Sequence, residues 1–302
     1  MRVLLSGSSG FIGSEVFSFL KAQEHEVIHL RRGNPTSSPD SIFWDPDREI
    51  FSHQSFENFD AVIHLAGEPL IGLWTAKKKE RIFSSRVQGT QLLTRIFTEI
   101  AHPPKVFICA SAIGFYGDRG EEELTENSAM GKGFLPSVCS HWELATQEKA
   151  SPQVRIVNTR FGAVIGPGGG IVKKMLLPFK YGLGCSLGTG SQWMSWIALS
   201  DLVRAIAFCM TNDAIEGPVN CVSPHPVRQK RFAQLFANSL ARPLFLRLPA
   251  WLLRGLLGQM AEEVLLASQR VIPEKLQQHH FSFLTPTLEE AFRHDYHAPR
   301  KH

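Results

Sequence analysis

The sequence predicts an α/β fold, a doubly wound parallel sheet with helices on both faces. Short apolar runs alternate along the chain with longer segments whose apolar residues recur at helical spacing, which is typical of strand–helix–strand units. Such units connect parallel strands. The length of 302 residues suits one large α/β domain or two smaller ones, and 43% hydrophobic with 20% charged residues exclude a disordered chain.

The first strand–helix–strand unit is predicted at the start of the chain. Residues 2–6 form a short apolar run, residues 14–23 have helical periodicity, and residues 26–30 form a second apolar run. The helical apolar positions are Val16, Phe17, Phe19 and Leu20. The turn between the first strand and the helix, residues 7–13, reads GSSGFIG and carries a glycine at every third position.

This glycine turn predicts a dinucleotide-binding site. Gly7 allows a sharp turn off the strand, Gly10 lets a pyrophosphate approach the backbone, and Gly13 lets the helix pack closely on the sheet. Free N–H groups at the helix N-terminus favour phosphate. Glycines also gather in ordinary turns, but a position between the first strand and the first helix favours nucleotide binding. The turn residues assigned to the cofactor are Gly7, Ser9, Gly10, Phe11, Ile12 and Gly13.

The end of the second strand favours NADP(H) over NAD(H). NAD-selective sites place an acidic residue there, about 20 residues beyond the glycines, to bind the ribose 2′-hydroxyl. This chain has Arg31 and Arg32 at that place. Guanidinium groups suit a 2′-phosphate, and the alternative is that both arginines are solvated charges at a strand end.

The alternating pattern continues as far as about residue 165 and then loosens. The predicted elements are strands at 60–65, 106–110, 154–160, 193–197 and 218–222, helices at 76–100, 136–149, 199–210 and 229–240, and a helix pair around 249–268. Glycine-rich loops are expected at 166–170 and 181–190. The predicted organisation is a cofactor-binding core over 1–165, a substrate-side region over 166–245, a helical extension over 246–293 and a flexible tail over 294–302.

Composition narrows the class of protein. The formal charge of +4 is dispersed, which disfavours nucleic-acid binding. Five cysteines without a closely spaced pair are typical of a reduced, cytoplasmic protein. We expect no membrane span, because no long apolar run occurs, and no signal peptide, because the first residues enter a strand. The 12 histidines lack metal-ligand spacing, so no metal is expected.

Several segments resemble the short-chain dehydrogenase/reductase superfamily, in its extended, epimerase-like branch. They are GSSGFIG (7–13), HLAG (64–67), SAIGFYGD (111–118), GPGGG (166–170) and WIALSDL (196–202). Further segments, at 74–90, 125–135, 190–197 and 260–276, resemble an atypical epimerase-family group with a short helical C-terminal domain. The resemblance implies a Rossmann core and an NADP(H) site, and it only suggests a reaction class. It also adds Leu65, Ala66, Gly67, Arg86 and Val164 to the cofactor site.

The chain departs from this superfamily at its catalytic pair, Tyr-x-x-x-Lys. None of its three tyrosines is followed by lysine at that spacing, and Cys139 and Glu143 stand at the two places. They share one helical face, where the carboxylate would raise the pKa of the thiol. The candidate proton donors are therefore ranked Ser111, Tyr116, Glu143 and Cys139. Tyr116 is expected at the mouth of the cleft, and packing roles are the alternatives for Tyr116 and Cys139.

Two functions follow from these features. The first is an NADP(H)-dependent oxidoreductase or epimerase that acts on an unidentified small molecule with a non-standard acid or base. The alternative is a catalytically silent NADP(H)-binding redox sensor or protein-interaction module, because the catalytic pair is missing. A protein partner would dock on a leucine-rich face of the C-terminal helices, unless that face simply packs on the domain. Its residues are Leu252, Leu253, Leu256 and Leu257.

Overall fold

The computed structural model describes residues 1–33, 40–148 and 150–296, and its centre is a seven-stranded, all-parallel sheet. In spatial order the strands are β3 (Ser41–Trp44), β2 (Glu26–Arg32), β1 (Arg2–Ser6), β4 (Ala61–His64), β5 (Val106–Ala112), β7 (Arg155–Phe161) and β12 (Gly217–Cys221). The chain order reverses between β1 and β4. In open α/β sheets a ligand crevice forms outside the carboxyl ends of the strands at such a switch point.

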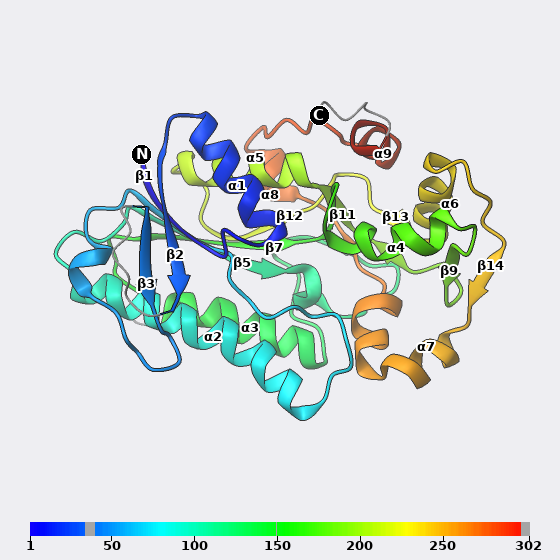
Figure 1. Cartoon of the computed structure of the whole chain (residues 1–302), viewed down its shortest axis with the longest axis horizontal. Helices are drawn as coiled ribbons and strands as arrows, with labels where there is room; N and C mark the ends of the chain where they lie inside the picture. The colour runs from blue at the N-terminus through cyan, green and yellow to red at the C-terminus, as the bar shows by residue number, and fades with distance from the viewer. Residues whose placement is uncertain (34–39, 149, 297–302) are drawn as a thin grey trace.

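Helices cover both faces of the sheet (Figure 1). One face carries α1 (Phe11–Ala22) and α5 (Leu199–Thr211), and the other carries α2 (Ala76–Glu99) and α3 (Phe134–Gln147). The doubly wound α/β fold is therefore confirmed.

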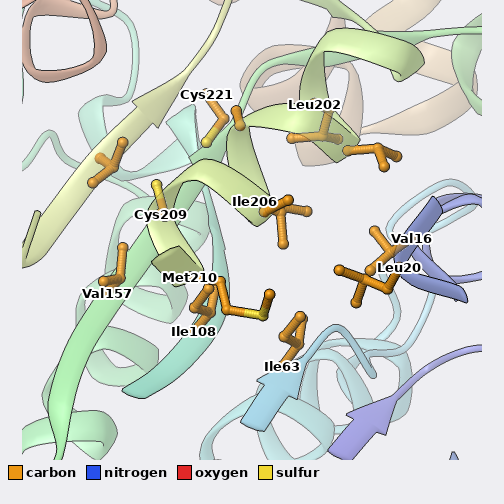
Figure 2. Close-up of a cluster of buried hydrophobic side chains, with 14 of the residues drawn as sticks. Val16, Leu20, Ile63, Ile108, Val157, Leu202, Ile206, Cys209, Met210 and Cys221 are labelled. Atoms are coloured by element: carbon orange, nitrogen blue, oxygen red, sulfur yellow. The ribbon is translucent and has the colours of Figure 1, made fainter. Parts of the chain in front are cut away.

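Successive residues of the central strands explain why both faces need cover. Ile63 and Ile108 face the α1–α5 side, whereas Val62 and Phe107 face the α2–α3 side. Because both faces are apolar, these strands read as continuous apolar runs. Figure 2 shows side chains of α1 and α5 pointing into one cluster above the sheet, among them Val16, Leu20, Ile206 and Met210.

A smaller region lies beside the carboxyl ends of β7 and β12. Its elements are β8 (Ala163–Ile165), α4 (Gly170–Lys180), β9 (Cys185–Leu187), β10 (Trp193–Met194), β11 (Trp196–Ala198), β13 (Val227–Arg228) and α6 (Gln229–Ser239). Its own core gathers around Trp196, Phe232 and Phe236. Within this region β8 pairs with β11. Helix α5, which covers the sheet, packs against both strands and so connects the region to the sheet.

The C-terminal extension packs on several parts of the chain. It comprises β14 (Leu246–Leu248), α7 (Ala250–Leu257), the π-helical turn η3 (Ala261–Leu266), β15 (Arg270–Val271), α8 (Glu274–Gln278) and α9 (Leu288–Tyr296). β14 pairs with β9, and β15 pairs with β6 (Glu123–Leu124). The buried Asp201 carboxylate on α5 accepts hydrogen bonds from the backbone N–H groups of Leu284 and Thr285. Of the expected tail, residues 297–302 lie outside the described residues.

The four leucines of the leucine-rich face predicted for α7 differ in their exposure to solvent. Leu253 is buried, Leu252 and Leu257 are half-buried, and Leu256 is exposed. Among the described helices, none is long and apolar enough to cross a membrane.

Candidate functional site

The glycine turn is fixed by close backbone contacts. Gly7 has a φ of +71°, a conformation that favours glycine, and its carbonyl accepts a hydrogen bond from the N–H of Gly10 at 2.9 Å. A Cβ atom on Gly13 would lie 2.1 Å from the Gly7 carbonyl oxygen, and one on Gly7 would lie 2.8 Å from the nitrogen of Ala66. Gly7 and Gly13 are therefore required by the packing of the turn itself.

The N-terminus of α1 fits an anionic ligand. Gly10 precedes the helix, no side chain caps its first N–H groups, and its first turn carries no acidic residue. Ser9 and Gly10, which precede the helix, are exposed, and Phe11 and Ile12 of its first turn are half-buried. Because a helix N-terminus carries partial positive charge, these residues fit the pyrophosphate of a dinucleotide.

Neighbouring side chains hold this turn in place. His29 of β2 hydrogen-bonds the hydroxyl of Ser8 at 2.7 Å, and Phe17 of α1 stacks on the His29 ring at a centroid distance of 4.4 Å. The ring of Phe11 packs under the glycine-rich loop 166–170, where a Cβ atom on Gly169 would lie 1.9 Å from the ring. This loop thus supports the first turn of α1.

The end of β4 is organised by a buried serine–histidine pair. The Ser6 hydroxyl oxygen lies 2.6 Å from Nδ1 of His64 and also accepts the backbone N–H groups of Leu65 and Ala66. Two incoming N–H groups occupy both lone pairs of the hydroxyl, so its proton goes to Nδ1. Burial lowers the pKa of His64 to about 4, which keeps the imidazole neutral.

The remaining predicted cofactor residues lie at the same edge of the sheet. Arg31 and Arg32 are exposed at the end of β2, and Arg32 contacts Asp47 at 3.5 Å. Gly67 is exposed just beyond β4. The Arg86 guanidinium of α2 lies next to it, because a Cβ atom on Gly67 would be 3.3 Å from Cζ of Arg86. Val164 is half-buried in β8, just after β7.

A hollow of about 390 Å³ lies elsewhere on the surface, beside α2. Its lining residues are Pro46, Asp47, Glu49, Gln88, Gln91, Leu92, Arg95 and Glu148. None of the predicted site residues lines it, and its mostly polar lining suits solvent. We therefore place the candidate site at the carboxyl edge of the sheet.

A buried ion pair includes Glu143, which stands at the place of the lysine in the Tyr-x-x-x-Lys pair of the short-chain dehydrogenase/reductase superfamily. Arg160 of β7 donates to both carboxylate oxygens of Glu143, from Nε to Oε1 at 2.8 Å and from Nη2 to Oε2 at 2.7 Å. The Ser111 hydroxyl donates to Oε1 of the same carboxylate at 2.7 Å. Glu143 is 9% exposed and Ser111 2%. Both groups are therefore engaged with each other and with Arg160.

Tyr116 belongs to the same network, and its expected position at the mouth of the cleft is wrong. The side chain is 0% exposed, in the turn η2 (Ile113–Tyr116) that follows β5. Its hydroxyl accepts a hydrogen bond from Arg160 at 2.8 Å and donates one to Asn220 at 2.7 Å. Burial raises the pKa of Tyr116 to about 12, although Arg160 opposes this rise. The phenol is thus protonated and fully bonded at neutral pH.

Cys139 is a packed, neutral thiol. It is 3% exposed, facing Gly114 in the turn after β5. Burial, reinforced by the Glu143 carboxylate, raises the pKa of Cys139 to about 12. A thiol in this state is not a nucleophile or a proton donor near neutral pH. The structure thus agrees with the packing role, and Cys139 and Glu143 do share a face of α3.

Three functional neighbours escaped the sequence prediction: Arg160, Asn220 and Glu126. Glu126 accepts backbone N–H groups from Asn220 and Lys275 on Oε1, while its buried Oε2 has no hydrogen-bond partner in the described part of the chain. Burial raises the pKa of this carboxyl. The available signal was Arg160 itself, a charged residue at the end of the predicted strand 154–160.

The C-terminal extension reaches this centre through a helix cap. The Glu263 carboxylate of η3 accepts the backbone N–H groups of Phe134 and Leu135 at 2.9 and 2.6 Å, the first two residues of α3. Gly133 makes room, because a Cβ atom there would lie 2.9 Å from the carboxyl carbon. The extension therefore fixes the N-terminus of the helix that carries Cys139 and Glu143.

Comparison with known proteins agrees with this geometry. A model described as the NAD dependent epimerase/dehydratase family matches residues 3–221, and one described as a domain of unknown function (DUF1731) matches residues 248–294. An epimerase family protein of Mycobacterium bovis is 36% identical over 290 residues, covering 96% of this chain and 95% of the relative. One of Staphylococcus aureus is 34% identical over 292 residues, covering 96% and 97%.

Solved structures show the same fold. A human epimerase family protein crystallised with NADPH is 30% identical, with a TM-score of 0.90, over 99% of this chain and 100% of that chain. A nucleoside-diphosphate sugar epimerase of Corynebacterium glutamicum is 33% identical, with a TM-score of 0.81, over 98% of this chain and 58% of that chain. These matches support a nicotinamide dinucleotide as the ligand of the glycine turn. The chain belongs to the NAD dependent epimerase/dehydratase family and carries a C-terminal DUF1731 domain.

Proposed function

We propose that this protein binds NADP(H) across the carboxyl ends of β1, β2 and β4. The uncapped N-terminus of α1 supports a pyrophosphate site at Gly7, Gly10 and Gly13. The single observation that favours NADP(H) over NAD(H) is the pair of exposed arginines, Arg31 and Arg32, at the end of β2. Two guanidinium groups suit a 2′-phosphate, whereas a 2′-hydroxyl would be better served by an acidic residue.

We further propose that the protein works by binding the dinucleotide, as a sensor of its redox state, and not as a dehydrogenase of the Tyr-x-x-x-Lys type. When bound, the dinucleotide supplies or accepts a hydride at its nicotinamide. Reduction of a carbonyl also needs a proton donor. Each of the four candidate donors is at most 9% exposed, and Glu143 is held by Arg160 and Ser111. This closed network supports the binding function.

A second function, an oxidoreductase or epimerase acting on a small anionic molecule, is favoured by one observation. Next to Gly67 lies Arg86, a buried cation without a bonded carboxylate among the described residues. Such a group suits an anionic substrate. Water would then have to supply the proton. The two functions share the cofactor site and differ in turnover.

Dinucleotide affinity tests the shared proposal. We expect NADPH to bind about tenfold or more tightly than NADH, because charged hydrogen bonds to the 2′-phosphate are worth about 1.5–3 kcal/mol. The variant Arg31→Asp with Arg32→Ala should reverse that preference. Arg48→Ala, which removes an exposed arginine paired with Asp45, is the matched control and should keep it. Equal affinities of the wild-type protein for both dinucleotides would refute the role of the two arginines.

We also propose a cytosolic location, where the cysteines remain reduced. All five are free thiols in the structure. Fractionation of cells that express the tagged protein should recover it with cytosolic markers, and recovery with an oxidising compartment would contradict this.

A further inference from the structure

Basic residues are concentrated in the smaller region and in the first part of the C-terminal extension. Residues 166–198 and 223–261 contain nine lysines and arginines and no aspartate or glutamate, although the whole chain has 32 basic and 28 acidic residues. Three of the nine pair with carboxylates from other segments: Arg228 with Glu121, Arg231 with Glu289 and Arg254 with Glu262. The other six are exposed and have no carboxylate partner in the described part of the chain: Lys173, Lys174, Lys180, Lys230, Arg242 and Arg247.

Large apolar side chains are exposed in the same segments. Seven of the fifteen exposed large apolar side chains of the described residues lie between positions 177 and 256. Phe245 is 87% exposed and Trp251 is 71% exposed. The other five are Leu177, Tyr181, Leu183, Leu246 and Leu256. A single exposed apolar residue is ordinary, whereas a group of them in one place indicates an interaction surface.

Strand pairing brings these segments together at one end of the molecule, opposite β2 and β3 (Figure 1). β14 pairs with β9, so that Leu246 lies opposite Cys185. Helix α4 leads into β9, and α7 follows directly after β14. Helix α6, which carries Lys230, packs against α4 and β9. We call the seven apolar and six unpaired basic side chains at this end the basic apolar surface.

Helix α7 shows that this surface lacks cover. Its sequence, AWLLRGLL, is apolar on all sides apart from Arg254, yet Leu253 is its one buried residue. Helices that are apolar all round are usually buried, either in a protein core or in lipid. The packing of α7 on the domain instead leaves Trp251 and Leu256 in contact with water.

We propose that the basic apolar surface binds the surface of a membrane that contains anionic lipids. Leucine and aromatic side chains would enter the boundary between headgroups and acyl chains, where tryptophan and tyrosine are favoured. The unpaired lysines and arginines would attract the anionic headgroups of a cytoplasmic leaflet. Binding of this kind is reversible, weakens with salt and needs no membrane-spanning helix. It is independent of the dinucleotide.

The charge of this surface favours an anionic membrane over two other occupants. In a twofold dimer the same patch meets itself, so unpaired cations would face unpaired cations with no acidic residue to compensate them. A nucleic acid would compensate the charge but would provide no apolar environment for the leucines, since interfaces with nucleic acids are polar. An anionic bilayer supplies both negative charge and an apolar interior.

Vesicle binding tests the proposal. The purified full chain is mixed with vesicles of phosphatidylcholine alone, or of phosphatidylcholine with phosphatidylserine, and bound protein is separated by flotation. We expect binding to the phosphatidylserine vesicles at low salt and affinity at least about tenfold weaker at high salt, because salt screens the attraction to the headgroups. Absence of binding to the anionic vesicles at low salt would overturn the proposal.

Charge reversal tests whether the unpaired lysines carry the binding. The triple variant Lys173→Glu, Lys174→Glu, Lys180→Glu should bind anionic vesicles about a hundredfold or more weakly, because each basic residue near the membrane is worth about fivefold in affinity. The matched control makes the same change in net charge at three exposed lysines elsewhere: Lys21→Glu, Lys77→Glu and Lys132→Glu. It should stay within about threefold of the wild type, because these charges are distant and screened. Equal losses in both triple variants would refute the assigned surface.

Substitution of the apolar residues tests insertion. Phe245→Ser with Trp251→Ser should weaken vesicle binding about tenfold or more, because two large apolar side chains no longer leave water. The control, Leu144→Ser with Leu284→Ser, changes two side chains that are 51% and 61% exposed outside this surface, and should bind as the wild type does. All four side chains are exposed, so both variants should keep the wild-type Tm. Equal binding by the two variants would contradict insertion.

Tryptophan fluorescence reports insertion at one residue. Trp251 is the one exposed tryptophan of the six in the chain. Anionic vesicles should therefore shift the emission of the wild type to shorter wavelength, and Trp251→Phe should still bind but lose this shift. A shift of the same size in Trp251→Phe would contradict the contact of α7 with lipid.

The remaining occupants give different results. A wild-type dimer on a sizing column without vesicles, lost in Phe245→Ser with Trp251→Ser, would overturn the proposal in favour of a second copy. Polyglutamate serves as the probe for an acidic protein. Binding to polyglutamate that persists in the same double variant, without binding to anionic vesicles, would overturn the proposal in favour of an acidic protein partner.

Discussion

Arg160 and Glu143 form a two-pronged ion pair inside the protein, with N–O distances of 2.8 and 2.7 Å. The carboxylate stands where the superfamily has the lysine of its catalytic pair, so the charge at that position is reversed. Arg160, from the neighbouring strand β7, restores neutrality. The position therefore remains polar, but Glu143 and Ser111, which could exchange protons with a substrate, are hydrogen-bonded within the protein.

Removing one partner of this pair should be more damaging than removing both. Glu143→Leu or Arg160→Met leaves the other charged group buried without its partner, which costs about 3–5 kcal/mol for a buried pair. In Glu143→Leu with Arg160→Met no charge remains, so the double variant should lose less stability than the sum of the single changes. Urea unfolding of all four proteins gives the double-mutant cycle. Losses below about 1 kcal/mol in both single variants would show that the pair is not a significant stabilising contact.

The Cys139 thiol should be unreactive in the folded protein. Because its pKa is raised to about 12, almost no thiolate exists at mildly alkaline pH. Iodoacetamide should therefore modify the half-buried Cys185 first, and Cys139→Ser should leave the rate unchanged while Cys185→Ser removes the fast reaction. The measurement is mass spectrometry of the labelled peptides. Native labelling of Cys139 as fast as in urea would contradict a packed, neutral thiol.

His64 should make the protein sensitive to mild acid. Its pKa is 6.5 in an unperturbed chain and about 4 in the folded protein, so the unfolded state binds the proton more readily between these values. The contribution of the neutral imidazole is complete above pH 6.5 and is lost as the pH falls towards 4. Over that window the wild type should lose about 3 kcal/mol more unfolding free energy than His64→Gln. Parallel pH profiles for the two proteins would disprove a buried neutral histidine.

Glu263 should stabilise the protein as the cap of α3. Glu263→Ala removes both acceptors of the Phe134 and Leu135 N–H groups, at a cost of about 1–2 kcal/mol. The neighbouring Glu262→Ala is the control, because that carboxylate is exposed and pairs with Arg254 on the surface. Denaturant unfolding compares the two variants. Equal losses would mean that the extension does not hold α3 through this cap.

Most of the sheet was predictable because its strands are apolar on both faces. The runs at 2–6 and 106–110 correspond to β1 and β5, and the glycine spacing located the turn into α1. β3 was missed because its apolar run, residues 42–44, is only three residues long, and only Trp44 of the strand is buried. α4 was missed because it follows a glycine-rich loop and contains Pro178, two signals that usually end helices.

The sequence pattern predicted where the candidate site lies, but it did not predict the hydrogen bonds and the ion pair within the site. The pattern placed Cys139 and Glu143 on one face of a helix, because that relation is local. It did not predict that Arg160 would lie opposite Glu143, since this contact depends on how α3 packs on β7 in the folded protein. For the same reason the cap from Glu263 to α3 had no local signal.

Turnover of bound NADPH tests the central claim most directly. NADPH binding is first established by its fluorescence, and its oxidation is then followed by nicotinamide absorbance with a panel of carbonyl compounds and nucleotide sugars. The account predicts tight binding and no oxidation faster than without a substrate. Rapid oxidation by the wild type that is abolished in Tyr116→Phe or Cys139→Ala, with NADPH binding intact, would show that one of these buried groups donates a proton, and would contradict the account.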